Sequence, residues 1–286
     1  MNIMILANMD LARRIDSFEA YGSKRLGEEV IRRRPNARAF VKPIGQGVAV
    51  YAGPDSPANK IIGVGYGDQP EWSALEEIEQ AYFERDSDVL AEVSTLAPAA
   101  NHAFLSERGY RLQGFENVLG RPISDEDGLP LEISGMTVEM ATGGALATWM
   151  DIVITGFLHP DATGAGSEVP IPPRQAMEDA MVPFAELPDF HAYLAFSGDT
   201  PAGGGGLRVA GGIAQLCGAS TLPAYRRRGI QSALLRRRLY DARGRGCDLA
   251  IMTTQPGSKS NLNALRQGFM LLYSRAILVK KQPSCP

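Results

Sequence analysis

Residues 219–235 read Ala-Ser-Thr-Leu-Pro-Ala-Tyr-Arg-Arg-Arg-Gly-Ile-Gln-Ser-Ala-Leu-Leu, and the interpretation of the whole chain starts from this stretch. The residues before it, 212–221, have the pattern of a β-strand, and the apolar repeat Leu235, Leu239 and Ala242 predicts a helix after it. A strand that turns through three arginines and a glycine into a helix gathers several backbone N–H groups ahead of a helix N-terminus. Such a junction is typical of a phosphate or pyrophosphate site.

The pattern Arg226-x-x-Gly229-x-Gln231 resembles the loop that binds the pyrophosphate of acyl-CoA in the GNAT superfamily of N-acyltransferases. In the superfamily the last position is usually Gly or Ala, so Gln231 departs from the pattern. The resemblance implies that acetyl-CoA is the acyl donor, with its pantetheine arm along the strand before the loop and that strand splayed from the next one, residues 248–253. The predicted cofactor-binding residues are Ala219, Ser220, Thr221, Arg226, Arg227, Arg228, Gly229, Ile230, Gln231, Ser232 and Asn263; for Asn263, helix packing or capping is an equal alternative.

Hydrophobic periodicity and turn residues predict alternating elements on both sides of a polar, proline-bearing segment near residues 121–130. The predicted strands are 37–41, 47–51, 60–65, 88–93, 110–119, 136–140, 191–196, 206–209, 212–221, 248–253 and 269–279. The predicted helices are 18–33, 72–85, 99–108, 144–157, 174–187, 227–243 and 259–267.

The order of elements over residues 136–280 matches the GNAT fold, and residues 18–120 resemble a shorter version of it. The fold class is therefore predicted as α/β with a mixed sheet: two tandem GNAT-like domains, each a mostly antiparallel twisted sheet flanked by helices. We expect a degenerate, non-catalytic domain at 1–125, a linker at 126–133 and a catalytic domain at 134–286. The first copy lacks the arginine–glycine loop, and Asp68 and Glu71 before its helix would repel a pyrophosphate.

Two other runs are predicted to be structural. The four glycines of residues 203–206 indicate a flexible turn or a strand bulge. Residues 236–238, three arginines, fan over about 200° of a helix at 100° per residue, which favours a solvated, ion-paired surface.

The bulk composition suits a globular enzyme that is not a nucleic-acid binder. The 286 residues include 29 basic and 32 acidic ones, with 44% hydrophobic and 21% charged residues, and the net charge is −3. The three cysteines have no metal-ligand spacing, so we expect no metal and a reducing compartment. The N-terminus is a poor signal peptide and no apolar run could span a bilayer, so we predict a cytoplasmic protein without membrane partners. The expected oligomeric state is a monomer or a homodimer.

Catalytic residues are harder to place because the helix at 259–267 lacks the tyrosine that GNAT enzymes often carry there. Tyr273, in the following strand, and His191, acting through water, are the predicted substitutes, although a packed role is open for both. The leading hypothesis is direct acetyl transfer from acetyl-CoA to a primary amine of a small molecule or peptide, with the amine near loop 158–172. The alternatives are a non-catalytic CoA-binding or interaction protein, and transfer of a longer acyl group.

Overall fold

The computed structural model describes residues 5, 7–66, 74–128, 135–160 and 171–283. The predicted amine-site loop, most of the predicted linker and the acidic stretch with Asp68 and Glu71 lie largely or wholly outside these residues. Two compact units are distinguished. The C-unit comprises Met1–Ile5, Leu119–Arg174 and Phe184–Leu271, and the N-unit comprises Leu6–Val118, Gln175–Pro183 and Leu272–Pro286.

The N-unit combines most of the first half of the sequence with the last strand of the second half. Its elements are α1 (Met9–Arg33), β1 (Phe40–Ile44), β2 (Gly47–Tyr51), β3 (Lys60–Val64), α2 (Leu75–Phe83), β4 (Val89–Ser94), α3 (Ala99–Glu107), most of β5 (Arg111–Pro122) and most of β11 (Met270–Lys280). The strand order is β1-β2-β3-β4-β11-β5. β3 and β4 are parallel, whereas β11 pairs with β4 in the antiparallel sense.

Helix α1 covers one face of the N-unit sheet, and its start shows why the sequence prediction was too short. The side chain of Asn8 accepts a hydrogen bond from the Leu11 N–H at 2.8 Å, so the helix begins at Met9 rather than near residue 18. Ala20 of α1 packs against Val48, Val50 and Ile62 of the sheet. A second cluster of buried apolar residues includes residues of α2 and α3.

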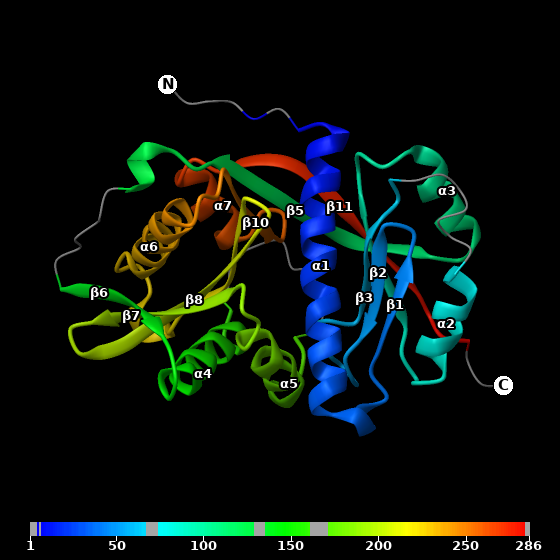
Figure 1. Ribbon diagram of the computed structural model, residues 1–286, viewed down its shortest axis with the longest axis horizontal. Helices are drawn as coiled ribbons and strands as arrows, with labels where there is room; N and C mark the ends of the chain where they lie inside the picture. Colours follow the sequence, from blue (N-terminus) through cyan, green and yellow to red (C-terminus); the bar gives the residue numbers. More distant parts are fainter. Residues whose placement is uncertain (1–4, 6, 67–73, 129–134, 161–170, 284–286) are drawn as a thin grey trace. The chain divides into compact units, whose positions relative to one another are not determined.

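The C-unit contains the arginine–glycine loop at residues 226–232. Its elements are the end of β5, β6 (Met136–Ala141), α4 (Ala145–Leu158), parts of α5 (Arg174–Ala185), β7 (Phe190–Ser197), β8 (Thr200–Ala210), β9 (Ile213–Thr221), α6 (Ile230–Gly244), β10 (Leu249–Thr254) and α7 (Lys259–Arg266). The strand order is β5-β10-β9-β8-β7-β6, antiparallel from β6 to β9, with β9 and β10 parallel. Helices α6 and α4 lie on opposite sides of β8 (Figure 1).

The four-glycine run Gly203–Gly206 is not a flexible turn, as the sequence suggested, but the buried middle of β8. A Cβ atom at Gly203 would lie 2.5 Å from Ile230 of α6, and one at Gly204 would lie 2.8 Å from Val153 of α4. The glycines therefore let a helix approach the strand closely from each side. The register between β8 and β9 shifts within the run, between Gly204 and Gly206, with the extra residue on β9, which agrees with the predicted alternative of a strand bulge.

The predicted fold class is confirmed, because the structure is a mixed α/β fold with the expected order of elements. The compact units are discontinuous in sequence, since β5 and β11 each contribute residues to both. The boundaries at 125 and 134 stay a prediction about the two sequence repeats.

Candidate functional site

The turn between β9 and α6 is a short exposed loop whose backbone is set by two residues with positive φ. β9 ends at Thr221, and a single 3₁₀ turn, Pro223–Tyr225, follows it. Arg227 has φ 62° and Gly229 has φ 86°, and Gly229 caps α6, which begins at Ile230. These two left-handed residues turn the chain sharply into the helix.

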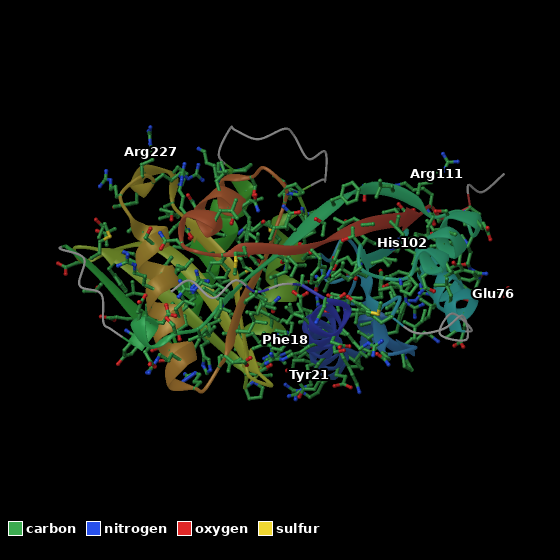
Figure 2. All side chains as sticks on the ribbon, turned by 90° about the horizontal axis from the view of Figure 1, so that it is seen from above. Phe18, Tyr21, Glu76, His102, Arg111 and Arg227 are labelled. Atoms are coloured by element: carbon green, nitrogen blue, oxygen red, sulfur yellow. The ribbon has the colours of Figure 1, made fainter. Side chains whose placement is uncertain are left out.

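The backbone N–H groups of residues 227–232 have no hydrogen-bond acceptor in the part of the chain that the structure describes. The first backbone bond at this end of the helix runs from the Ala233 N–H to the Gly229 carbonyl, at 3.0 Å. Residues 227–229 are exposed, and the Arg227 side chain projects outward from the ribbon (Figure 2). A row of free N–H groups at an exposed helix N-terminus can bind an anion.

Some side chains around the loop hydrogen-bond to nearby protein groups and hold the loop in shape, whereas others are free to contact a ligand. Arg226 braces it, because its guanidinium donates to the carbonyls of Thr221, at 3.3 Å, and of His159. Gln231 donates to the Thr221 hydroxyl at 2.9 Å. The Arg228 guanidinium lies 5.3 Å from the centroid of the Tyr225 ring.

Strands β9 and β10 pair over only three residues each, although both continue further. The parallel register ends at Ile251↔Gln215, whereas β9 runs on to Thr221 and β10 to Thr254. Beyond this point the edge of β9 that faces away from β8 has no strand partner in the described residues. The irregularity opposite Gly204 and Gly206 lies in the same segment, where Gly218 has φ 54°.

Of the predicted residues on β9, Ser220 has its side chain committed to packing. Its hydroxyl donates to the Ile152 carbonyl of α4 at 2.9 Å, and Gly156 leaves room for it. Only the main chain of Ser220 is therefore open to a role in binding. Asn263 is exposed on α7, and its side chain has no hydrogen-bond partner among the described residues.

His191 lies on β7 opposite Leu207, near the far end of α6 from the loop. Burial, followed by the charge of Arg245, lowers the pKa of His191, while Asp241 and Asp189 oppose this shift. Asp241 belongs to the last turn of α6 and Arg245 is its C-cap residue, and 15 residues of helix span about 22 Å at 1.5 Å per residue. The structure therefore does not bring His191 to the loop.

Tyr273 belongs to the N-unit, where its side chain is 4% exposed. Its hydroxyl donates to Asp16 Oδ1 at 2.5 Å, and burial raises the pKa of Tyr273. Tyr66 donates to the other oxygen of Asp16 at 2.6 Å, and Arg275 donates to Asp16 Oδ1. The structure thus places Tyr273 in a buried polar cluster of the N-unit.

Residues 162–269 match the family model described as the acetyltransferase (GNAT) family. The chain contains a GNAT acetyltransferase domain. The matched residues include the loop at 226–232 and the strands on both sides of it. No curated protein sequence matches the chain at a significant level.

Solved structures extend the GNAT fold over most of the chain. A GCN5-related N-acetyltransferase from Kribbella flavida is 19% identical and has a TM-score of 0.63, covering 91% of this chain and 95% of its own. A tandem GNAT protein from the clavulanic acid biosynthesis pathway is 13% identical and has a TM-score of 0.59, with 85% and 82% covered. At these identities the likeness establishes a tandem GNAT fold and nothing about substrates.

In the N-unit, the strands that correspond to the GNAT pair β9 and β10 are β3 and β4. Their register shifts between Ile61 and Val64, but β3 stays paired as far as its last residue. The register includes Val64↔Val93, at the last residue of β3. The amide of Asn101 donates to the Gly65 carbonyl at 2.9 Å, which occupies the main chain just after β3. The separation seen between β9 and β10 of the GNAT domain has no counterpart here in the described residues.

The N-unit contains a buried charged cluster around Asp16 that no sequence pattern predicted. Arg275, 1% exposed, contacts four carboxylates, and Lys60 donates to one of them at 2.9 Å. The carboxylates are Asp16 and Glu19 of α1, Glu92 of β4 and Glu116 of β5. The one sequence signal was the position of Asp16 and Glu19 among apolar residues of an amphipathic helix.

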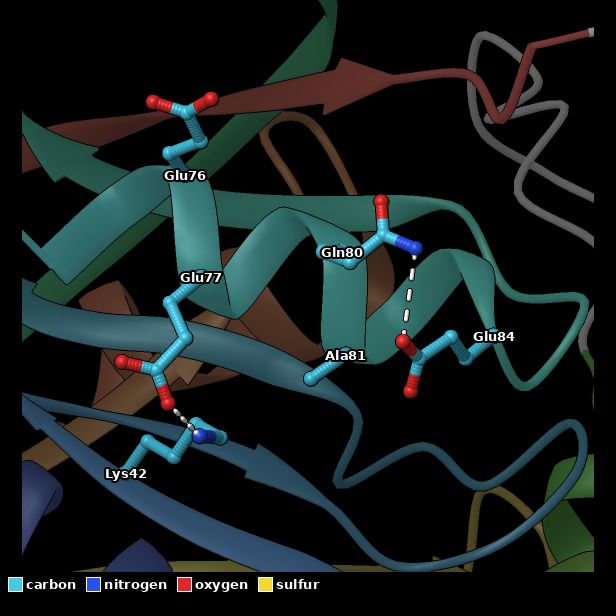
Figure 3. A pocket seen from close by; sticks show the side chains of 6 residues that line it. All are labelled: Lys42, Glu76, Glu77, Gln80, Ala81 and Glu84. Carbon is cyan, nitrogen blue, oxygen red and sulfur yellow. Dashed lines mark hydrogen bonds and ion pairs between the residues drawn. The ribbon is translucent and has the colours of Figure 1, made fainter.

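A surface hollow of about 610 Å³ in the N-unit lies over α2 and β1 (Figure 3). Its lining residues are Lys42, Glu76, Glu77, Gln80, Ala81 and Glu84. Glu77 pairs with Lys42, and Gln80 donates to Glu84 at 3.4 Å, so much of the polar lining is satisfied internally. Three carboxylates make this hollow unsuited to a phosphate ligand such as CoA.

Across the described ranges, no three metal-ligating side chains gather in a metal-binding arrangement, and none of the helices there is long and apolar enough to cross a membrane. The expectation of a metal-independent reaction stays a prediction.

The three arginines at 236–238 do not all lie on a solvated surface, as the sequence suggested. Arg236 is exposed and Arg237 pairs with Asp241, but Arg238 is 2% exposed. The helix turns its third arginine towards β8, where the glycine run leaves room for a side chain. Helical spacing correctly predicted that the three side chains point in different directions. It did not predict which of them would be buried against the sheet.

Proposed function

We propose that the C-unit binds acetyl-CoA and transfers its acetyl group directly to a primary amine of a small molecule or a peptide. The observation that carries this proposal is the row of N–H groups at residues 227–232, which lack acceptors among the described residues and begin at the exposed residues 227–229 before α6. Hydrogen bonds to a charged group contribute about 1.5–3 kcal/mol each, so a few of them suffice to hold a pyrophosphate. The GNAT family match over the same residues supports the proposal.

Each residue of the loop has a part in this proposal. The N–H groups of residues 228–232 bind the pyrophosphate, and the exposed Arg227 and Arg228 add charge-assisted contacts to phosphate oxygens. Arg226 acts indirectly, because its bonds to two carbonyls hold the loop in shape. The pantetheine arm lies along residues 219–221, where β9 has an open edge, and Asn263 hydrogen-bonds the arm.

The reaction needs a neutral amine at the thioester carbonyl. The amine nitrogen forms a bond to this carbon, the C–S bond breaks, and the sulfur leaves as CoA thiolate. One proton leaves the ammonium before attack, a second leaves the nitrogen during the reaction, and the thiolate takes up one. Neutralising an amine of pKa about 10.4 at pH 7 costs about 4.6 kcal/mol. His191 and Tyr273 stay predictions for proton transfer, and the contacts of neither support that role.

The N-unit, in this proposal, does not bind CoA. β3 stays paired with β4 as far as its last residue, and the first turn of α2 carries Glu76 and Glu77 where the first turn of α6 has Gln231 and Ser232. Carboxylates at that position repel a pyrophosphate.

The test is calorimetric titration of acetyl-CoA into the wild-type protein and into Gly229→Glu. We expect wild type to bind acetyl-CoA and Gly229→Glu to bind it at least about 100-fold more weakly. The glutamate side chain would occupy the space nearest the phosphates, and its carboxylate would repel them. Gly198→Glu is the matched control, since Gly198 is also exposed, has φ 57° and has nothing within 4 Å of its Cβ position. Equal binding by Gly229→Glu and wild type would refute the loop assignment.

Thiol release with a panel of amines then separates the alternatives. Release with acetyl-CoA and at least one amine supports the proposed transferase. Tight binding without release for any amine favours a non-catalytic CoA-binding protein, for which the absence of a tyrosine from α7 is the motivating observation. A higher kcat/KM with a longer acyl-CoA would reassign the donor.

A further inference from the structure

Arg238 of α6 is buried in the C-unit and binds two strands at once. Its Nη1 donates to the Gly206 carbonyl of β8 at 2.9 Å and to the Cys217 carbonyl of β9 at 3.4 Å. Its Nε donates to the Leu234 carbonyl of its own helix at 3.0 Å. One guanidinium therefore joins α6, β8 and β9.

The positive charge of Arg238 is held by carbonyl dipoles alone. No carboxylate lies within ion-pair distance of it in the part of the chain described here. Burial lowers the pKa of Arg238 to about 10. An apolar side chain in such a place often gives an equally stable or more stable core. The position of Arg238 is therefore poorly explained by stability.

The two strands are adapted to the guanidinium. A Cβ atom at Gly205 would lie 3.1 Å from the guanidinium carbon, so the glycine provides the space that it fills. Gly206 pairs with Cys217 at the register shift, where two residues of β9, Gly218 and Ala219, lie opposite one residue of β8, Gly205. Arg238 thus hydrogen-bonds to the carbonyls of the Gly206–Cys217 pair, where the irregular segment of β9 begins.

This irregular segment is next to the open edge of β9. Regular pairing with β10 ends at Gln215, two residues before Cys217. In a trans peptide the carbonyl and the next N–H point in opposite directions. Fixing the Cys217 carbonyl towards α6 therefore also fixes the direction of the Gly218 N–H. A hydrogen bond to the carbonyl also polarises that N–H and makes it a stronger donor.

We propose that Arg238 is a positioning residue for acetyl transfer: it sets the Cys217–Gly218 peptide so that the Gly218 N–H donates to the thioester carbonyl of acetyl-CoA. This inference rests on the proposed function, because it requires the pantetheine arm along β9. It assigns Arg238 no contact with the donor or the amine.

The experiment compares wild type, Arg238→Met and Arg236→Met. Arg236→Met is the matched control, because Arg236 is an exposed arginine of the same helix. Acetyl-CoA labelled with ¹³C at the thioester carbonyl reports polarisation through its infrared stretching frequency. We expect wild type and Arg236→Met to lower that frequency relative to free acetyl-CoA. Arg238→Met should bind acetyl-CoA within about threefold of wild type, show a frequency near the free value, and release thiol at least about tenfold more slowly.

The outcomes separate this inference from the proposed function. No binding by wild type refutes the proposed function and the inference with it. Binding by all three proteins with the same lowered frequency overturns the inference alone. If Arg238→Met does not fold, Gly205→Ala decides, because its Cβ crowds the guanidinium without removing it. A partial return of the frequency in Gly205→Ala supports the role of Arg238, and an unchanged frequency overturns it.

Discussion

The three consecutive arginines of the loop have three different surroundings. Arg226 donates to the carbonyls of Thr221 and His159, and Arg228 lies over Tyr225. Arg227 is exposed and has a left-handed backbone, which costs a non-glycine residue on the order of 1 kcal/mol. The residue that carries the sequence motif most clearly, Arg226, is thus the one whose side chain faces the protein.

Gln231 is the residue at which the loop departs from the usual GNAT pattern, and its side chain is tied to Thr221. If the donor passes between the start of α6 and the end of β9, this bond must break or move. We expect Gln231→Ala to bind acetyl-CoA about fivefold more tightly, corresponding to about 1 kcal/mol for one hydrogen bond. Titration calorimetry measures the change, with Thr221→Val as the variant that breaks the same bond and keeps Gln231. Weaker binding by Gln231→Ala would mean that the amide contacts the donor.

Between elements, the main electrostatic feature is the cluster that joins α1 to β3, β4, β5 and β11 in the N-unit. Burial, followed by the neighbouring Glu92 carboxylate, raises the pKa of Glu116 from 4.5 to about 7, while Lys60 and Arg275 oppose the shift and Glu19 adds to it. A raised pKa in the folded state means that the folded protein retains a proton that the unfolded chain loses between about pH 4.5 and 7. Stability therefore falls as the pH rises through this range.

Glu116→Gln should remove this dependence. The full shift corresponds to about 3 kcal/mol, and the 25% exposure of the Glu116 side chain reduces the expectation to on the order of 2 kcal/mol. We expect the variant to unfold at a higher Tm than wild type at pH 8 and at a similar Tm at pH 5. Glu107→Gln, at an exposed site on α3, serves as control and should follow wild type. A Glu116→Gln variant with the wild-type pH profile would contradict the assignment.

The sequence was sufficient for elements with local signals and insufficient for those that depend on distant partners. The loop at 226–232 was found because a strand, a turn and a helix adjoin in sequence. Arg275 was not, because its carboxylate partner Asp16 lies 259 residues away. For the glycine run the sequence left a flexible turn and a strand bulge open, because the helices that pack on the strand are distant in sequence; the structure shows a strand with a register shift.

At the scale of the whole molecule, the two halves of the sequence do not correspond to the two compact units. β11, from the second half, pairs with β4 of the first half from Arg275↔Ser94 to Lys280↔Val89. Residues 119–122 of β5 belong to the C-unit, and the Ile123 N–H donates to the Asp248 carbonyl at 3.0 Å. Each unit therefore depends on a strand that a cut between the halves would remove.

A fragment of residues 1–128 should accordingly lack cooperative thermal unfolding when it is produced alone. It would expose the edge of β4 and leave Asp16 and Glu19 buried without Arg275. Adding a synthetic peptide of residues 268–286 should restore a cooperative transition in circular dichroism, and the same peptide with Arg275→Glu should not. Cooperative unfolding of the fragment without any peptide would show that β11 is dispensable.

The position of β11 also has a consequence for biosynthesis. A ribosome completes residues 1–118 long before it reaches residue 280. The N-unit therefore lacks β11, which pairs with β4, until translation is nearly finished. During that interval the acidic side of α1 has no guanidinium to neutralise it. We therefore expect this unit, although made first, to reach its native state last, and a nascent chain to need protection of its open sheet edge until synthesis ends.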